Sequence, residues 1–117
     1  MKGLSIVVAR TVSPEIVVLQ LSGSINSSTV AQLDSSFNAL LRSGRRTIVL
    51  DLSGTEFISN SGVTMLLGTV SSLREIDGDL VLMNPSKLVN DILEVLELKT
   101  QIRIIKDINE LKVGVTP

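Results

Sequence analysis

A short polar turn at residues 59–62 (Ser-Asn-Ser-Gly) joins a strand-like segment to a helix-like one, and this junction says most about the fold. A nearly continuous apolar run at 48–52 precedes the turn and is typical of a strand covered on both faces. From Val63 onward, apolar residues recur at helical spacing. Strand-turn-helix units of this kind build domains in which helices pack against a sheet. The turn also places the Ser61 hydroxyl near a helix N-terminus, where unpaired N–H groups and the helix dipole favour negative charge.

The rest of the chain alternates between the same two patterns. Strands are predicted over 4–12, 15–21, 46–52, 80–83 and 102–105, and helices from Val30 to Leu41, from Val63 to about Asp77, from an Asn84-Pro85 cap to Leu96, and over 107–112. Only Ser13 and Pro14 separate the first two strands, which predicts an antiparallel hairpin. The third strand follows a helix, which implies a parallel partner reached by a right-handed crossover. We therefore predict one α/β domain over residues 1–117, with a mixed sheet and a frayed tail at 113–117.

Composition narrows the possible functions. The 117 residues include neither cysteine nor histidine, which excludes disulfides, thiolate metal sites and a Ser-His-Asp triad, and fits a reducing compartment. Eleven basic and 12 acidic residues give a net charge of -1 without a basic stripe, and the only aromatic residues are Phe37 and Phe57, so nucleic acid is not an expected partner. No segment approaches the roughly 18 apolar residues of a membrane span, and the start MKGLSIVVARTV is unlike a signal peptide. We expect a cytoplasmic protein without membrane insertion.

Catalysis is not expected either. Asp51 and Glu56 flank the polar turn and are candidates for an acid/base pair, but neither has a basic partner nearby in the sequence. We interpret Asp51 as the end of a strand and Glu56 as an exposed loop residue. Ser61 as a nucleophile would need a lysine as its base, and neither Gly-x-Ser-x-Gly nor Ser-x-x-Lys surrounds it. The sequence predicts a non-enzyme with no cofactor and no metal site.

Two serine-bearing loops, 23–28 and 59–62, each follow a strand and precede a helix, so both are expected at the carboxyl edge of the sheet. Their hydroxyls and amides would suit a phosphate; the serines concerned are Ser24, Ser27, Ser59 and Ser61. Helix capping is the favoured explanation for these serines. A phosphate made covalently on Ser61 would be tolerated by the helix end, although few capping serines are modified.

The central run D-L-S-G-x-x-F-I-x-x-S-G-V-x-x-L-L resembles the signature of STAS domains, the anti-sigma factor antagonists of bacteria. The resemblance extends over nearly the whole chain, through the opening strand pair, the Gly23–Asn26 turn and the step at Asn84 and Pro85. It implies a single STAS-like α/β domain, whose mixed sheet has four or five strands with helices mainly on one face. It also implies a small, non-catalytic regulatory module.

The resemblance further implies a regulatory cycle. Members of the family bind an anti-sigma factor that is also a serine kinase, which frees the sigma factor for transcription. The kinase phosphorylates the serine before the signature glycine, and a metal-dependent serine phosphatase reverses the modification. Carried onto this chain, the phosphoacceptor is Ser61, with Ser59, Asn60 and Gly62 as its neighbours in the switch. We expect a docking patch framed by the first loop and the exposed side of the second helix, namely Ser24, Asn26, Ser27, Met65, Thr69 and Ser72.

This chain departs from the family pattern at two positions. Ser59 and Asn26 stand where the family commonly has aspartate, so negative charge is missing around the acceptor. The change either eases phosphorylation or impairs recognition by a kinase. Ser59 is a competing acceptor, although no glycine follows it. Two other functions are compatible with the sequence: a STAS-like accessory subunit of a membrane lipid-transport complex, and a phosphate- or nucleotide-binding sensor.

Overall fold

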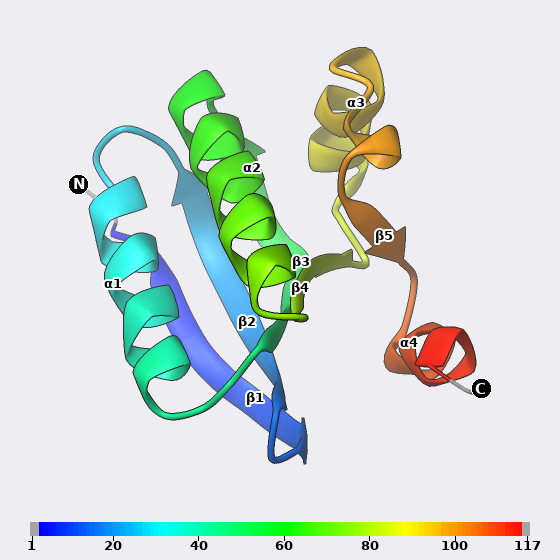
Figure 1. Cartoon of the computed structure of the whole chain (residues 1–117). Coiled ribbons are helices and arrows are strands. Elements are labelled where there is room, and N and C mark those ends of the chain that lie inside the picture. Colours follow the sequence, from blue (N-terminus) through cyan, green and yellow to red (C-terminus); the bar gives the residue numbers. More distant parts are fainter. Residues whose placement is uncertain (1–2, 116–117) are drawn as a thin grey trace.

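Five strands form a mixed sheet in the order β1-β2-β3-β4-β5 (Figure 1). The computed structural model describes residues 3–115. Strands β1 and β2 form the predicted antiparallel hairpin, and β2 through β5 run parallel to one another. In chain order the elements are β1 (Ser5–Ser13), β2 (Ile16–Ile25), α1 (Val30–Arg42), β3 (Thr47–Ile58), α2 (Asn60–Glu75), β4 (Asp79–Met83), α3 (Lys87–Val95), a 3₁₀ turn (Leu98–Thr100), β5 (Arg103–Ile105) and α4 (Ile108–Val115).

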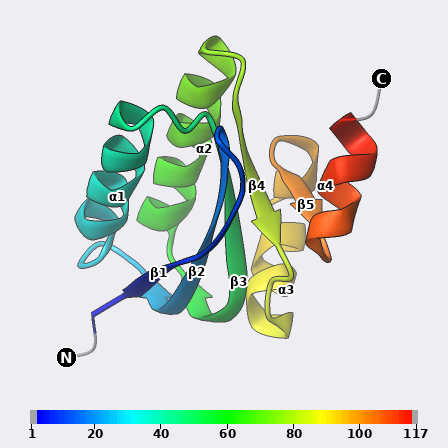
Figure 2. The same ribbon diagram turned by 90° about the horizontal axis from the view of Figure 1, so that it is seen from below.

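Side chains of the central strands alternate between two apolar layers. In β3, Ile48 and Leu50 point into the larger core, which also receives buried residues of α1, α2 and α3. Val49, between them, belongs to a smaller cluster on the other face, completed by Leu111 of α4. Figure 2 shows α1 and α2 on one side of the sheet and α4 on the other. The prediction of an α/β domain with helices mainly on one face is confirmed.

The third strand is longer than predicted. Instead of ending at Leu52, β3 continues to Ile58 and pairs with β2 as far as the Ile25–Ile58 register. The polar residues after Leu52 stay in the sheet because the backbone of β2 pairs with them, across a register shift between Gln20 and Ser22. The interpretation of Asp51 as a strand end was therefore wrong, because Asp51 lies within β3. Glu56 is exposed as expected, but in a strand rather than a loop.

Helix boundaries differ from the predictions at three places. Helix α2 begins at Asn60, three residues before the expected Val63. Helix α3 is capped by Ser86 rather than by Asn84 and Pro85, since Asn84 adopts a left-handed backbone conformation with φ of 49°. Helix α4 extends to Val115, so the predicted frayed tail overlaps its last three residues, and residues 116 and 117 lie outside the described residues.

Candidate functional site at the N-terminal end of helix α2

The carboxyl ends of β2 and β3 bring the two serine-bearing segments together. Ile25 and Ile58 are cross-strand partners, and the Ser59 N–H donates to the Ile25 carbonyl oxygen at 2.8 Å. The start of α2 is thereby fixed to the end of β2. This adjacency at the carboxyl edge of the sheet was expected, and the structure confirms it.

Ser59, not Ser61, is the N-cap of α2. The Ser59 Oγ accepts a hydrogen bond from the Gly62 N–H at 3.2 Å, and the Ser59 carbonyl accepts from the Val63 N–H at 2.9 Å. With Ser59 as the cap, Ser61 occupies the second position inside the helix. The residue expected at or just outside the helix start therefore lies within the first turn.

The Ser61 hydroxyl is exposed and lies 2.9 Å from the Ser59 hydroxyl, whereas the Ser59 side chain is half-buried. No acidic residue occupies the first turn of α2. Within α2, the Ser61 oxygen therefore meets only the N–H groups of the first turn and the positive end of the helix. A negatively charged group attached to Ser61 would meet favourable electrostatics here.

Gly62 brings this helix end close to the sheet. A methyl group on its Cα would lie 2.8 Å from the Ile25 Cγ2 and 3.0 Å from the Ile58 Cγ1. Both isoleucines are buried in the larger core. The glycine after Ser61 therefore has a packing role of its own, because a larger residue would push the first turn of α2 away from the sheet.

The first-loop part of the predicted docking patch is ordered by the backbone. Ser24 lies at the end of β2, opposite Phe57. The Asn26 Oδ1 accepts from the Ser28 N–H at 2.9 Å, and the Asn26 carbonyl accepts from the Thr29 N–H, also at 2.9 Å. Asn26 thus caps a turn, and Ser27 within that turn is exposed.

The helix part of the predicted patch faces α1. Met65, Thr69 and Ser72 line a groove of about 260 Å³ between α1 and α2, together with Phe37 and Leu41. Met65 and Thr69 are half-buried rather than exposed, and the Thr69 hydroxyl donates to the Met65 carbonyl at 2.9 Å. Ser72 lies 11 residues beyond Ser61, or about 16 Å along the helix axis at 1.5 Å per residue. Ser72 therefore lies apart from Ser61 along the helix, and the docking patch stays a prediction.

Sequence reasoning missed a second groove, on the opposite flank of the Ser59–Ser61 turn. It has a volume of about 500 Å³ and lies between the end of β3 and helix α3. Its lining comprises Phe57, Ile58, Ser59, Asn60, Asp91, Ile92, Val95 and Leu96. The available signal was the short α3 segment, which carries more apolar residues than its buried stripe of Val89 and Leu93 needs.

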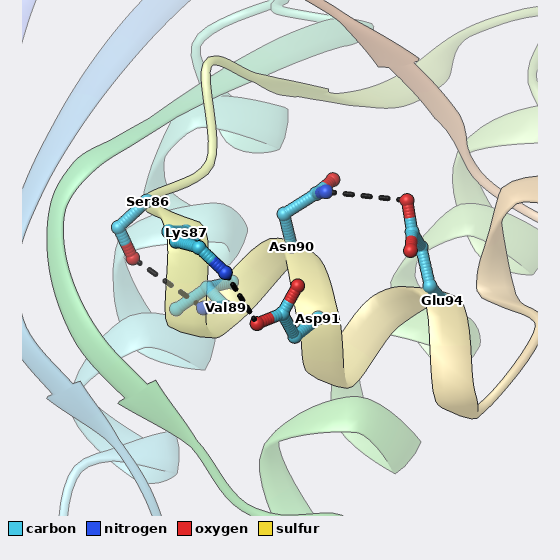
Figure 3. Close-up of polar contacts among 6 residues, drawn as sticks. All are labelled: Ser86, Lys87, Val89, Asn90, Asp91 and Glu94. Carbon is cyan, nitrogen blue, oxygen red and sulfur yellow. Dashed lines mark hydrogen bonds and ion pairs between the residues drawn. The ribbon is translucent and has the colours of Figure 1, made fainter.

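The ion pairs among the described residues lie at the surface. On α3, the Lys87 ammonium lies 3.5 Å from an Asp91 carboxylate oxygen, and the Asn90 amide donates to Glu94 (Figure 3). A hydrogen bond from Lys99 holds the pKa of Glu94 below its ordinary value. Within residues 3–115, no group of three or more acidic side chains is arranged to hold a metal ion. None of the helices in that part of the chain is long and apolar enough to cross a membrane.

Comparison with known proteins places this geometry in a family. The STAS domain family model matches residues 8–111. The chain is 31% identical over 84 residues to the anti-sigma F factor antagonist of Lysinibacillus sphaericus, an alignment covering 71% of this chain and 72% of that protein. It is 33% identical over 75 residues to BtrV of Bordetella bronchiseptica, named as a candidate anti-sigma factor antagonist, and that match covers 64% of this chain and 65% of BtrV, just under two thirds of its length.

Solved structures show the same fold. The unphosphorylated form of the anti-sigma factor antagonist SpoIIAA superposes with a TM-score of 0.70 at 22% identity, and the match covers 94% of this chain and 96% of SpoIIAA. The family match covers almost all of the described chain. It includes the parallel β2–β3 pair and the serine-glycine step at the start of α2. From its sequence match and its architecture together, this chain belongs to the STAS domain family.

Proposed function

We propose that this chain is an anti-sigma factor antagonist, a non-catalytic module that binds an anti-sigma factor with serine kinase activity and releases a sigma factor for transcription. Phosphorylation of Ser61 switches the binding off, and a serine phosphatase restores it. The names of the two sequence relatives support the antagonist role. SpoIIAA, which has the same fold, has been solved in both an unphosphorylated and a phosphorylated form.

The observation that carries the proposal is the exposed Ser61 hydroxyl at the positive end of α2, with no acidic residue in the first turn. A phosphoserine brings about -1.5 to -2 charges at neutral pH. The helix end accommodates that charge, so the fold stays intact while the surface around it changes in charge and bulk. A partner that covers Ser61 would then have to desolvate the phosphate, which weakens binding.

Ser61 is favoured over Ser59 as the acceptor by geometry. The Ser59 oxygen already accepts from the Gly62 N–H, and its side chain is half-buried. A phosphate on Ser59 would replace a compact helix cap with a bulky group at a half-buried position whose N–H is bonded to the end of β2. The Ser61 oxygen has only the Ser59 hydroxyl as a hydrogen-bonding neighbour among the described residues, and it faces solvent.

The test uses the purified chain with each anti-sigma factor kinase of its source organism. With ATP, we expect one added phosphate on the peptide that carries Ser61, measured by intact-mass and fragment analysis. Ser61→Ala should abolish the modification, and Ser59→Ala should retain it. Addition of a metal-dependent serine phosphatase should remove the phosphate and restore binding. Phosphate on Ser59 alone would contradict the assignment.

Calorimetry measures the affinity of the anti-sigma factor kinase for the wild-type chain and for Ser61→Asp. We expect Ser61→Asp to bind at least about tenfold more weakly, since a buried uncompensated charge opposes association. The same change places a carboxylate at the helix N-terminus, which should leave stability equal or higher by about 0.3–1 kcal/mol. Unfolding therefore does not explain the loss. Equal affinity of Ser61→Asp and wild type would overturn the switch.

A further inference from the structure

An apolar groove adjoins the Ser59–Ser61 turn on the side of α3. Three large apolar side chains remain exposed along it: Phe57 at 45%, Val95 at 80% and Leu96 at 40%. The other aromatic residue of the chain, Phe37, is 1% exposed in the core. Figure 1 shows the N-terminal end of α2 and the C-terminal half of α3 at the same end of the molecule.

The groove exists because α3 has two apolar faces and the sheet covers only one of them. Val89 and Leu93 are fully buried against the sheet. Ile92, Val95 and Leu96 instead border the groove, with Phe57 from the end of β3 opposite them. Exposed apolar side chains gathered in one place mark an interaction site more often than single ones do.

The groove is continuous with the switch. Ser59 and Asn60 belong to its lining, and the Ser59 hydroxyl lies 2.9 Å from the Ser61 hydroxyl. A molecule seated in the groove would therefore reach the site of phosphorylation. Asp91 supplies the one charged side chain among the described lining residues, and its carboxylate pairs with Lys87 at 3.5 Å (Figure 3). The lining thus suits uncharged, apolar side chains.

We propose that this groove receives apolar side chains of the anti-sigma factor, so that one partner covers both the groove and Ser61. The proposal rests on the proposed function and moves the main docking contact from the α1 side of α2 to the α3 side. It also explains how a phosphate acts at a distance from the apolar contacts. An apolar segment that closes over the groove cannot seat fully while a hydrated, doubly charged group stands at its rim.

The experiment compares Val95→Ser and Phe57→Ser with the control Ile76→Ser. Val95 is 80% exposed, so its replacement removes apolar surface from the groove with little effect on folding. Ile76 matches Phe57 in its exposed fraction, 46% against 45%. It lies at the C-cap of α2, 15 residues from Ser61 or about 22 Å along the helix. Circular dichroism and thermal unfolding verify that each variant folds. If Phe57→Ser does not fold, the comparison of Val95→Ser with Ile76→Ser is the test.

Affinity is measured by calorimetry with the purified anti-sigma factor that binds the wild-type chain. We expect each groove variant to bind about tenfold more weakly and Ile76→Ser to bind within about twofold of wild type. Equal affinity of wild type and Val95→Ser would overturn the groove proposal while leaving the antagonist function in place. If no anti-sigma factor of the source organism binds the wild-type chain, the proposed function and the groove proposal both fail. Sedimentation that shows a dimer dissolved by Val95→Ser would make a second copy the occupant and overturn the proposal.

Discussion

At the residue scale, Gly62 is limited by the side chains around it rather than by its backbone conformation. We predict that Gly62→Ala lowers the free energy of unfolding by about 1–3 kcal/mol, because the new methyl group would lie 2.8 Å from the Ile25 Cγ2 in a filled core. Gly68 in the same helix is the matched control, since a methyl group there meets nothing within 4 Å. Gly68→Ala should raise stability by up to about 1 kcal/mol through helix propensity. Urea unfolding of both variants measures the contrast, and equal stabilities would contradict it.

Glu94 supplies a second test at this scale, through its titration. The hydrogen bond and charge of Lys99, 3.0 Å away, lower the pKa of Glu94 in the folded chain. A lowered pKa contributes stability above the pKa of the unfolded chain, and this contribution is lost as the pH falls through the folded value. We predict that Lys99→Ala raises the Glu94 pKa toward its ordinary value. Carbon-13 NMR titration of the Glu94 carboxyl group in both chains measures the change, and an unchanged Glu94 pKa in Lys99→Ala would contradict it.

At the element scale, Ser86 fixes the start of α3 to the sheet. Its hydroxyl donates to the Thr55 carbonyl of β3 at 2.8 Å and accepts from the Val89 N–H at 3.5 Å. We predict that Ser86→Ala costs about 1–2 kcal/mol, the upper part of the range for a lost N-cap, because it also leaves the Thr55 carbonyl without this partner. Hydrogen exchange should accelerate in α3 more than in α1. Ser35→Ala, on the exposed face of α1, should leave both helices unchanged.

The elements themselves were largely predictable, because each strand and helix carries its own periodicity. The end of β3 was not, since the polar residues 53–56 stay extended only because β2 pairs with them. The sequence also left the cap of α2 open between Ser59 and Ser61. Ser59 and Ser61 are equally good capping residues by type, and the bond from the Ser59 N–H to the Ile25 carbonyl selects the former.

The position of the candidate site in the fold was predictable from the sequence, but the groove beside it was not. The sequence located the serine turn at the carboxyl edge of the sheet, and Ser61 as the phosphoacceptor stays a prediction. The groove beside it depends on which face of α3 meets the sheet. Val89 with Leu93, and Ile92 with Val95 and Leu96, both have helical spacing, so spacing alone does not tell the fully buried pair from the residues that line the groove.

At the scale of the whole molecule, the two faces of the sheet carry unequal cores. The larger core contains 21 buried residues, most of them from the sheet and from α1, α2 and α3, whereas the smaller contains Val18, Val49, Val81, Ile105 and Leu111. Of the described helices, α4 is the one that contributes to the smaller cluster. Since the free energy of local opening follows the apolar area that an element buries, α4 should open independently of the rest.

Paired truncations of one leucine in each core test this difference. Leu66→Ala, in the larger core, should lower the global free energy of unfolding by about 2–5 kcal/mol and accelerate hydrogen exchange throughout the sheet. Leu111→Ala should accelerate exchange in α4 and β5 while β2, β3 and α2 keep their protection, because the larger core is untouched. The turn at Ser61 lies on the face that stays closed, so Leu111→Ala should still be phosphorylated there and bind its partner as wild type does. Equal loss of protection across the sheet in both variants would mean that the two cores unfold as one unit.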